Sequence, residues 1–116
     1  MPNAALEASA HSDGPRARID LRGDIDASAR EALAAAYEET AAARELLLDF
    51  TAVDYINSTG IALIVGLLAR ARADARSISA CGLSPHYREI FEITRLSDFM
   101  TILADERTQE GEQPDE

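Results

Sequence analysis

Apolar and polar residues alternate with two different periods along this chain, and each period predicts a different element. Residues 16–23 alternate between charged and apolar, which is typical of a strand with one buried face, and Gly23 is expected to end it. The Ala-rich segment 27–43 has a composition that favours a helix. The expected inner stripe of this helix repeats every fourth residue and consists of Ala29, Leu33, Tyr37 and Ala41.

A second strand and helix follow in the same order. Residues 45–50 form a short, mainly apolar run, which is typical of a strand buried on both faces. After a loop, a helix is expected from Ser58 to about Asp74. Its expected core stripe is Ile61, Ile64, Val65 and Leu68, widened by Leu63 and Leu67.

The last third of the chain predicts two strands, in residues 77–82 and 99–103, with a helix between them. Ser84 is a favourable N-cap for this helix, and Pro85 suits its first position. The side chains expected to share one face are Tyr87, Ile90, Phe91 and Thr94.

Strands that alternate with helices predict an α/β domain, with a mixed, largely parallel sheet of about four or five strands and about three or four helices packed against it. The 116 residues suffice for one small domain. We expect the domain to span residues 15–104, after an N-terminal segment, 1–14, that is partly ordered or an edge strand. Residues 105–116 carry six acids and no large apolar side chain, which predicts a flexible acidic tail.

The formal net charge of -10 argues against a nucleic-acid partner, because binding to phosphates needs a basic surface. Acids are concentrated in residues 20–54, so this part of the chain either attracts a basic partner or is simply a solvated surface. The single cysteine, Cys81, cannot form an internal disulfide, which suits a reducing cytosol. With no signal peptide, and with an apolar run of residues 60–69 that is too short to span a bilayer, we expect a soluble cytoplasmic domain without a membrane partner.

The sequence gives little support for catalysis. Ser58 lies in Ile-Asn-Ser-Thr-Gly, which lacks the first glycine of a nucleophile elbow, and only His11 and His86 could serve as its base. These two histidines and Cys81 have no metal-ligand spacing. Isolated glycines and the absence of lysine argue against a phosphate-binding loop. We therefore predict a protein that is not an enzyme and needs no cofactor or metal.

Two interpretations of Ser58 are compatible with each other. As a helix start it could be the N-cap, worth about 1 kcal/mol, with Asn57 or Thr59 able to share that role. Gly60 would let a strand or loop approach closely. The position also lies at the carboxyl edge of the predicted parallel strands, and a helix N-terminus tolerates an added phosphate well. A phosphate there would place new charge close to Asp24, Asp26 and Asp54, and so would switch partner binding while leaving the fold intact.

Three ordered motifs resemble STAS-domain anti-sigma factor antagonists over roughly residues 15–104. The central one is LLLDFTAVDYINSTGIALIVGLLARAR (residues 46–72), which is similar to the family's buried strand, loop and Asp-Ser-Ser/Thr-Gly helix start. Gly-Asp-Ile-Asp (residues 23–26) looks like its Gly-acid-apolar-Asp turn. CGLSPHYREIFEITRLSDFMTIL (residues 81–103) is similar to its late strand, Ser-Pro helix and closing strand.

The resemblance implies a partner-switching cycle. The unphosphorylated domain would bind an anti-sigma factor, a serine kinase of the histidine-kinase-like ATPase fold, and thereby release a sigma factor. Phosphorylation of Ser58, with Thr59 as the second choice, would end the complex, and a PP2C-type phosphatase would restore it. The domain would be a monomer or weak dimer. The residues implied to bind the partner are Asp24, Asp26, Asp54, Asn57, Ser58, Thr59 and Gly60.

The sequence departs from the family pattern at one position, and two other functions are alternatives to the partner switch. The acid that usually precedes the serine is Asn57 here, which keeps the capping capacity and loses a charge. In the main alternative, the domain is a STAS scaffold or a regulatory subunit of a stress-sensing or transporter complex, in which Ser58 is only a helix cap. A small nucleotide-binding domain is the third reading, although it lacks lysine and a glycine-rich loop.

Overall fold

The computed structural model describes residues 5–103, which form one five-stranded sheet in the order β1-β2-β3-β4-β5. β1 (Glu7–Asp13) pairs antiparallel with β2 (Arg16–Ile25). β3 (Glu45–Ile56), β4 (Ser77–Cys81) and β5 (Thr101–Ile102) continue the sheet in parallel. The predicted α/β fold with a mixed, largely parallel sheet is confirmed. The predicted acidic tail, residues 105–116, lies outside the described residues.

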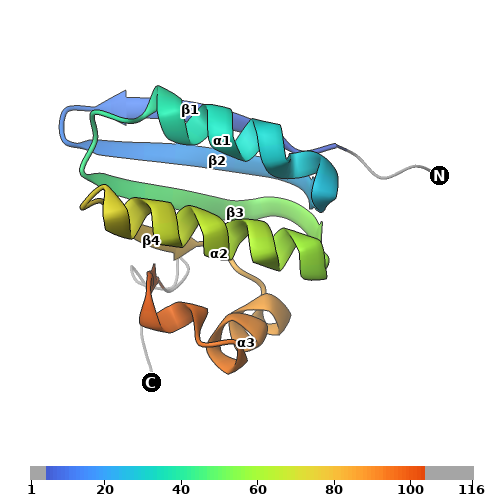
Figure 1. Ribbon diagram of the computed structural model, residues 1–116. Helices are drawn as coiled ribbons and strands as arrows, with labels where there is room; N and C mark the ends of the chain where they lie inside the picture. The colour runs from blue at the N-terminus through green and yellow to red at the C-terminus, as the bar shows by residue number, and fades with distance from the viewer. Residues whose placement is uncertain (1–4, 104–116) are drawn as a thin grey trace, which may run out of the picture.

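The helices cross over between the parallel strands. α1 (Arg30–Glu39), preceded by the 3-10 turn η1 (Ala27–Ala29), and α2 (Ser58–Ala73) lie side by side on one face of the sheet (Figure 1). α3 (Pro85–Ile93) lies past β4, and the turn η2 (Leu96–Asp98) leads into β5. The hydrophobic core therefore fills the space between the sheet and these helices, where α1 and α2 bury their inner stripes.

The two faces of the sheet differ. In β2 the apolar residues of the alternating pattern are buried beneath the helices, as predicted, and the charged ones point to the other face. That face carries ion pairs such as Arg16 with Glu45 at 3.2 Å. The prediction that residues 45–50 are buried on both faces is wrong, because Leu46 and Leu48 are buried while Leu47, on the face without α1 and α2, is only half-buried.

Two strands run further than predicted, and this extension carries the chain toward Ser58. Gly23 does not end β2. It adopts φ 103°, a conformation that favours glycine, at a shift in the pairing register, and β2 continues to Ile25. β3 likewise continues to Ile56, pairing with this extension of β2 beyond the last residue that pairs with β4, Asp49. The loop predicted before Ser58 is therefore mostly strand.

α1 is shorter than the predicted helix and has an unusual C-terminus. It ends at Glu39, so Ala41 is exposed, whereas Ala29, Leu33 and Tyr37 are buried as expected. Arg76, which follows α2, reaches across to the end of α1. Its guanidinium donates to the carbonyl oxygens of Ala43, Tyr37 and Thr40, at 2.7, 3.2 and 2.6 Å, and so satisfies acceptors that a helix end leaves open.

Tyr37 links the ends of α1 and α2. Its ring lies between two guanidinium groups, 4.6 Å from that of Arg70 and 4.4 Å from that of Arg76. Its hydroxyl donates to Asp74 at 2.7 Å. Burial, together with this hydrogen bond, raises the pKa of Tyr37 above its ordinary value, so the phenol stays a donor at neutral pH.

α2 has nearly the predicted bounds but a different buried face. Ile64, Leu67 and Leu68 are buried as expected, and Gly60 and Ala71 join them. Val65 is 46% exposed, so its assignment to the core is wrong. Apolar residues surround most of this helix, so their period alone did not determine which side faces the sheet.

α3 begins as predicted, because the Ser84 hydroxyl accepts a hydrogen bond from the Tyr87 amide at 3.2 Å. Phe91 is fully buried, and its ring meets that of Phe50 edge to face with centroids 5.8 Å apart. Thr94, predicted on the same face, is exposed at the end of the helix. The last strand is also shorter than predicted, and Phe99 lies exposed before it.

Candidate functional site

At the N-terminus of α2, Ser58 is exposed to solvent and the neighbouring Asn57 caps the helix. The Asn57 side-chain oxygen accepts a hydrogen bond from the Gly60 amide at 2.8 Å, so Asn57 is the N-cap. The prediction that Ser58 caps the helix is therefore corrected: Ser58 is the first helical residue. Ser58 and Thr59 are exposed, and within residues 5–103 the Ser58 hydroxyl has no hydrogen-bond partner.

The first turn of α2 packs directly on the end of β2, with no space for a side chain at Gly60. A Cβ atom at Gly60 would lie 1.9 Å from the carbonyl oxygen of Ile25. The same oxygen accepts a hydrogen bond from the Asn57 amide at 3.2 Å. The close approach expected at Gly60 is confirmed, and it fixes the position of Ser58 relative to the turn that follows β2.

Of the three predicted acidic neighbours, Asp24 and Asp54 lie on the paired strands β2 and β3, and Asp26 follows β2 directly. Asp26 caps η1, where the Ser28 hydroxyl and amide donate to its carboxylate at 2.6 and 3.0 Å. These hydrogen bonds hold the pKa of Asp26 below its ordinary value, so the group stays charged. Asp54 is exposed near the end of β3. Asp24 is only 6% exposed, so little of its side chain is accessible from solvent.

Sequence reasoning did not identify Tyr87 as a part of the site. Its hydroxyl accepts a hydrogen bond from the Ile56 amide at 2.9 Å, at the residue where β3 ends and two positions before Ser58. β4 no longer pairs with β3 at this point, so Tyr87 takes over an amide that the sheet leaves free. The only available signal was its position in the first turn of the Ser84-capped helix.

We expect Tyr87→Phe to loosen the strand end that carries Ser58. The substitution leaves the ring in place but removes the acceptor for a half-buried amide, at a cost of about 1 kcal/mol in the free energy of unfolding. Urea unfolding and amide hydrogen exchange at Ile56 measure the two effects. Tyr55→Phe is the matched control, because Tyr55 is 49% exposed and its hydroxyl has no partner among the described residues. Equal exchange at Ile56 in wild type and Tyr87→Phe would contradict the assigned role.

The two histidines considered for catalysis make contacts with residues other than Ser58. His11 pairs with Asp20 at 3.3 Å across β1 and β2, and His86 is exposed, with its ring against Tyr87. Within residues 5–103, no group of three or more His, Cys, Asp or Glu side chains is arranged to hold a metal ion. No helix in the same range is both long and apolar enough to cross a bilayer.

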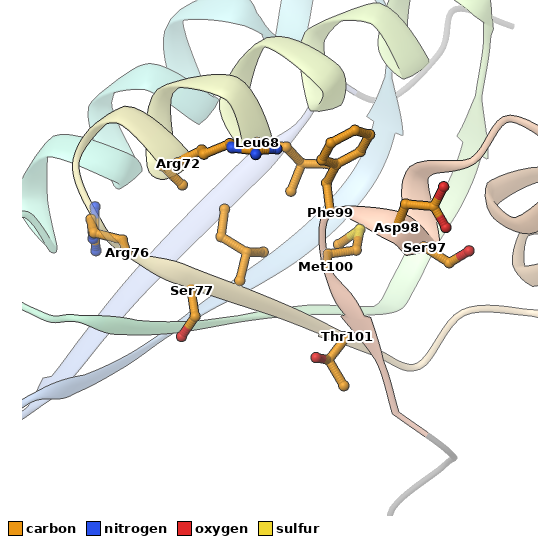
Figure 2. Close-up of a pocket in the computed structure, with 11 residues that line it drawn as sticks. Leu68, Arg72, Arg76, Ser77, Ser97, Asp98, Phe99, Met100 and Thr101 are labelled. Atoms are coloured by element: carbon orange, nitrogen blue, oxygen red, sulfur yellow. The ribbon is translucent and has the colours of Figure 1, made fainter.

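A hollow in the surface lies at the C-terminal end of α2, away from Ser58 (Figure 2). It measures about 550 Å³ and is lined by Leu68 and Ile78 inside and by Arg72, Ser77 and Phe99 toward its rim. Arg72 extends over the exposed ring of Phe99, with its guanidinium carbon 5.7 Å from the ring centroid (Figure 2). Because Arg72 lies near the last residue of α2 and Ser58 is the first, this hollow is separate from the candidate site.

Comparison with known proteins agrees with the fold and the motifs. The family model described as "Mlab, STAS domain" matches residues 8–104. The anti-sigma-B factor antagonist of Listeria monocytogenes is 34% identical over 86 residues, covering 72% of this chain and 75% of that protein. The solved structure of the anti-sigma factor antagonist SpoIIAA in its unphosphorylated form is 20% identical, with a TM-score of 0.65 over 91% of this chain and 92% of that chain.

The phosphorylated form of SpoIIAA, described as a Bacillus cell fate determinant, is 21% identical and also has a TM-score of 0.65, over 91% of this chain and 97% of that chain. At such identities the two SpoIIAA structures show a shared fold. The family itself is established by the matched model and by the Listeria relative. The chain belongs to the STAS domain family of anti-sigma factor antagonists.

Proposed function

We propose that this protein is a phosphorylation-controlled antagonist whose switch residue is Ser58. In the unphosphorylated state it binds an anti-sigma factor that is also a serine kinase of the histidine-kinase-like ATPase fold, and thereby frees a sigma factor. The kinase then modifies Ser58 and the complex separates. A metal-dependent phosphatase of the PP2C type restores the first state. The domain is a substrate and a binding module, without catalysis of its own.

The free hydroxyl of Ser58 is the observation that carries this proposal. Because Asn57 caps α2, the Ser58 oxygen is exposed and takes no part in holding the helix. The alternative of a scaffold in which Ser58 is only a helix cap requires that oxygen to accept a backbone hydrogen bond, and Asn57 already fills this role. A phosphate at Ser58 would also lie where unpaired helix amides and the dipole favour negative charge.

The surroundings of Ser58 explain why modification would affect a partner more than the fold. Asp26, held charged by Ser28, and the exposed Asp54 already make this surface acidic. A phosphate adds about 1.5 to 2 negative charges. A partner surface that approached the neutral serine closely would then have to accommodate a bulky anion, whereas the solvated helix start would not.

The covalent step is an ordinary phosphoryl transfer. The Ser58 Oγ forms a bond to the γ-phosphorus of ATP, the bond from that phosphorus to the β,γ-bridging oxygen breaks, ADP leaves, and the hydroxyl proton is lost to solvent or to a base of the kinase. In the reverse direction the phosphatase uses water, which releases inorganic phosphate and regenerates the hydroxyl.

Incubation with ATP and each ATPase-fold anti-sigma factor encoded in the same genome tests the proposal. We expect the wild-type chain to gain the mass of one phosphate, Thr59→Ala to gain the same, and Ser58→Ala to gain none. The phosphorylated chain is then expected to lose its affinity for that kinase. No gain on wild type with any of these kinases, or an equal gain on Ser58→Ala, would refute the switch.

A further inference from the structure

A small hollow between α1 and α2 has features that the fold alone does not require. It measures about 200 Å³ and opens to the surface formed by the two helices. Its floor is apolar and consists of Leu33, Leu63 and Leu67. Its walls are small residues, Ala34 from α1 and Ala62 and Gly66 from α2. A space of this size and lining fits one apolar side chain.

Gly66 is the residue that keeps the hollow open. Glycine in a helix interior is destabilising relative to alanine, because it loses more backbone freedom on folding. Some glycines compensate by allowing close packing, as Gly60 does. At Gly66, a Cβ atom would meet no atom of residues 5–103 within 4 Å, so no contact in this part of the chain requires a glycine there. The sequence thus retains a destabilising residue at a surface position where it leaves space for another molecule.

Two arginines mark the ends of the hollow. Arg70 is held in place by Glu38 at 3.1 Å and by the Tyr37 ring at 4.6 Å. Arg30 begins α1, and among residues 5–103 its guanidinium has no hydrogen-bond or ion-pair partner. An occupant with an apolar side chain flanked by carboxylates would complement the leucine floor and both cations.

The hollow continues the surface around Ser58. Ala62 follows Ser58 by about one helical turn, and Arg30 follows η1, which Asp26 caps. The combined surface therefore carries acids at the Asp26 and Ser58 end and two arginines at the hollow, where Arg70 is paired with Glu38 and Arg30 has no partner among residues 5–103. Such a charge pattern fixes the orientation of a partner that presents a basic group to the first part and acidic groups to the second.

We infer that this hollow is a docking socket for one apolar, carboxylate-flanked side chain of the anti-sigma factor, an inference that rests on the proposed function. A second copy of this chain docked α1 against α1 is a poorer occupant, because Glu31, Glu38 and Glu39 of the two copies would bring like charges together. Residues 104–116 could match the arginines in charge, but they contain no large apolar side chain for the leucine floor.

Filling the socket tests the inference. Gly66→Leu replaces glycine with a good helix former whose side chain would occupy the hollow, and its thermal midpoint is expected to be no lower than that of wild type. The partner is the ATPase-fold anti-sigma factor of the same genome that binds the unphosphorylated wild-type chain. Calorimetry measures the affinity of Gly66→Leu for this partner, which is expected to fall about tenfold or more. Arg30→Glu is expected to weaken the same complex and to reduce its dependence on salt.

Ala35→Leu is the matched control, because it adds the same side chain to an exposed helix position of α1 that does not line the hollow. Its affinity is expected to stay within about twofold of wild type. Wild-type affinity in Gly66→Leu would overturn the socket and leave the Ser58 switch standing. Wild-type protein that binds none of the anti-sigma factors would overturn both. Self-association that Gly66→Leu abolishes would overturn the socket in favour of a second copy.

Discussion

Replacing Arg76 by methionine is expected to lower the free energy of unfolding by about 3–5 kcal/mol, although Arg76 lies outside the candidate site. Its guanidinium donates to three backbone carbonyls near the end of α1 and to the Thr40 hydroxyl at 3.0 Å. Arg76, Thr40 and Ala43 are all buried. Methionine matches much of the side-chain volume but leaves these acceptors without donors in a place that water reaches poorly, and it removes the cation from the face of Tyr37.

Urea unfolding of the full chain, followed by circular dichroism and extrapolated linearly to zero urea, measures the loss. Arg72→Met is the matched control on α2, since Arg72 is exposed and its contact is with the exposed ring of Phe99. We expect the control to cost less than about 1 kcal/mol. Arg76→Lys should lie between the two, because an ammonium group keeps the charge but cannot reach all the acceptors in the planar arrangement of a guanidinium. If Arg76→Met lowered the free energy of unfolding by less than about 1 kcal/mol, water would be replacing the guanidinium as the donor to these carbonyl oxygens.

The sequence predicted the order of the elements because strands and helices in this chain have different apolar periods. It did not predict how far β2 and β3 run, since Gly23 is a usual strand terminator and here allows a change of register within the strand. The sequence also did not predict that Val65 is exposed. α2 is apolar on most sides, and only the packing of Gly60 and Ile64 against the sheet decides which side is buried.

For the candidate site, local chemistry was more informative than pattern. The motif around Ser58 identified the helix start, and the rule that Ser, Thr and Asn cap helices left three candidates. Which of them caps is decided by backbone geometry, and Asn57 has the extended conformation that an N-cap needs. Contacts between distant segments had no signal in the sequence. Tyr87 meets Ile56 across 31 positions, and Arg76 meets Thr40 across 36.

Gly60→Ala and Gly66→Ala make the same change in the same helix and are expected to shift stability in opposite directions. At Gly60 the new methyl group would lie 1.9 Å from the Ile25 carbonyl oxygen, which belongs to backbone that is fixed in the sheet. α2 must then move away from β2, at a cost on the order of 3 kcal/mol. At Gly66 the methyl group meets no atom of the described residues within 4 Å, and the higher helix propensity of alanine should raise stability by about 0.5–1 kcal/mol.

The same pair of variants separates the position of Ser58 from the stability of the fold. In Gly60→Ala the displaced helix start moves the serine away from Asp26, so phosphorylation by the cognate kinase and binding to it are expected to fall sharply under conditions where the variant remains folded. Gly66→Ala, whose N-terminus is unchanged, is expected to be phosphorylated at the wild-type rate. Urea unfolding and the rate of phosphate incorporation measure the two effects. If both variants shifted stability in the same direction, the close contact between α2 and Ile25 would not be what holds Ser58 in place.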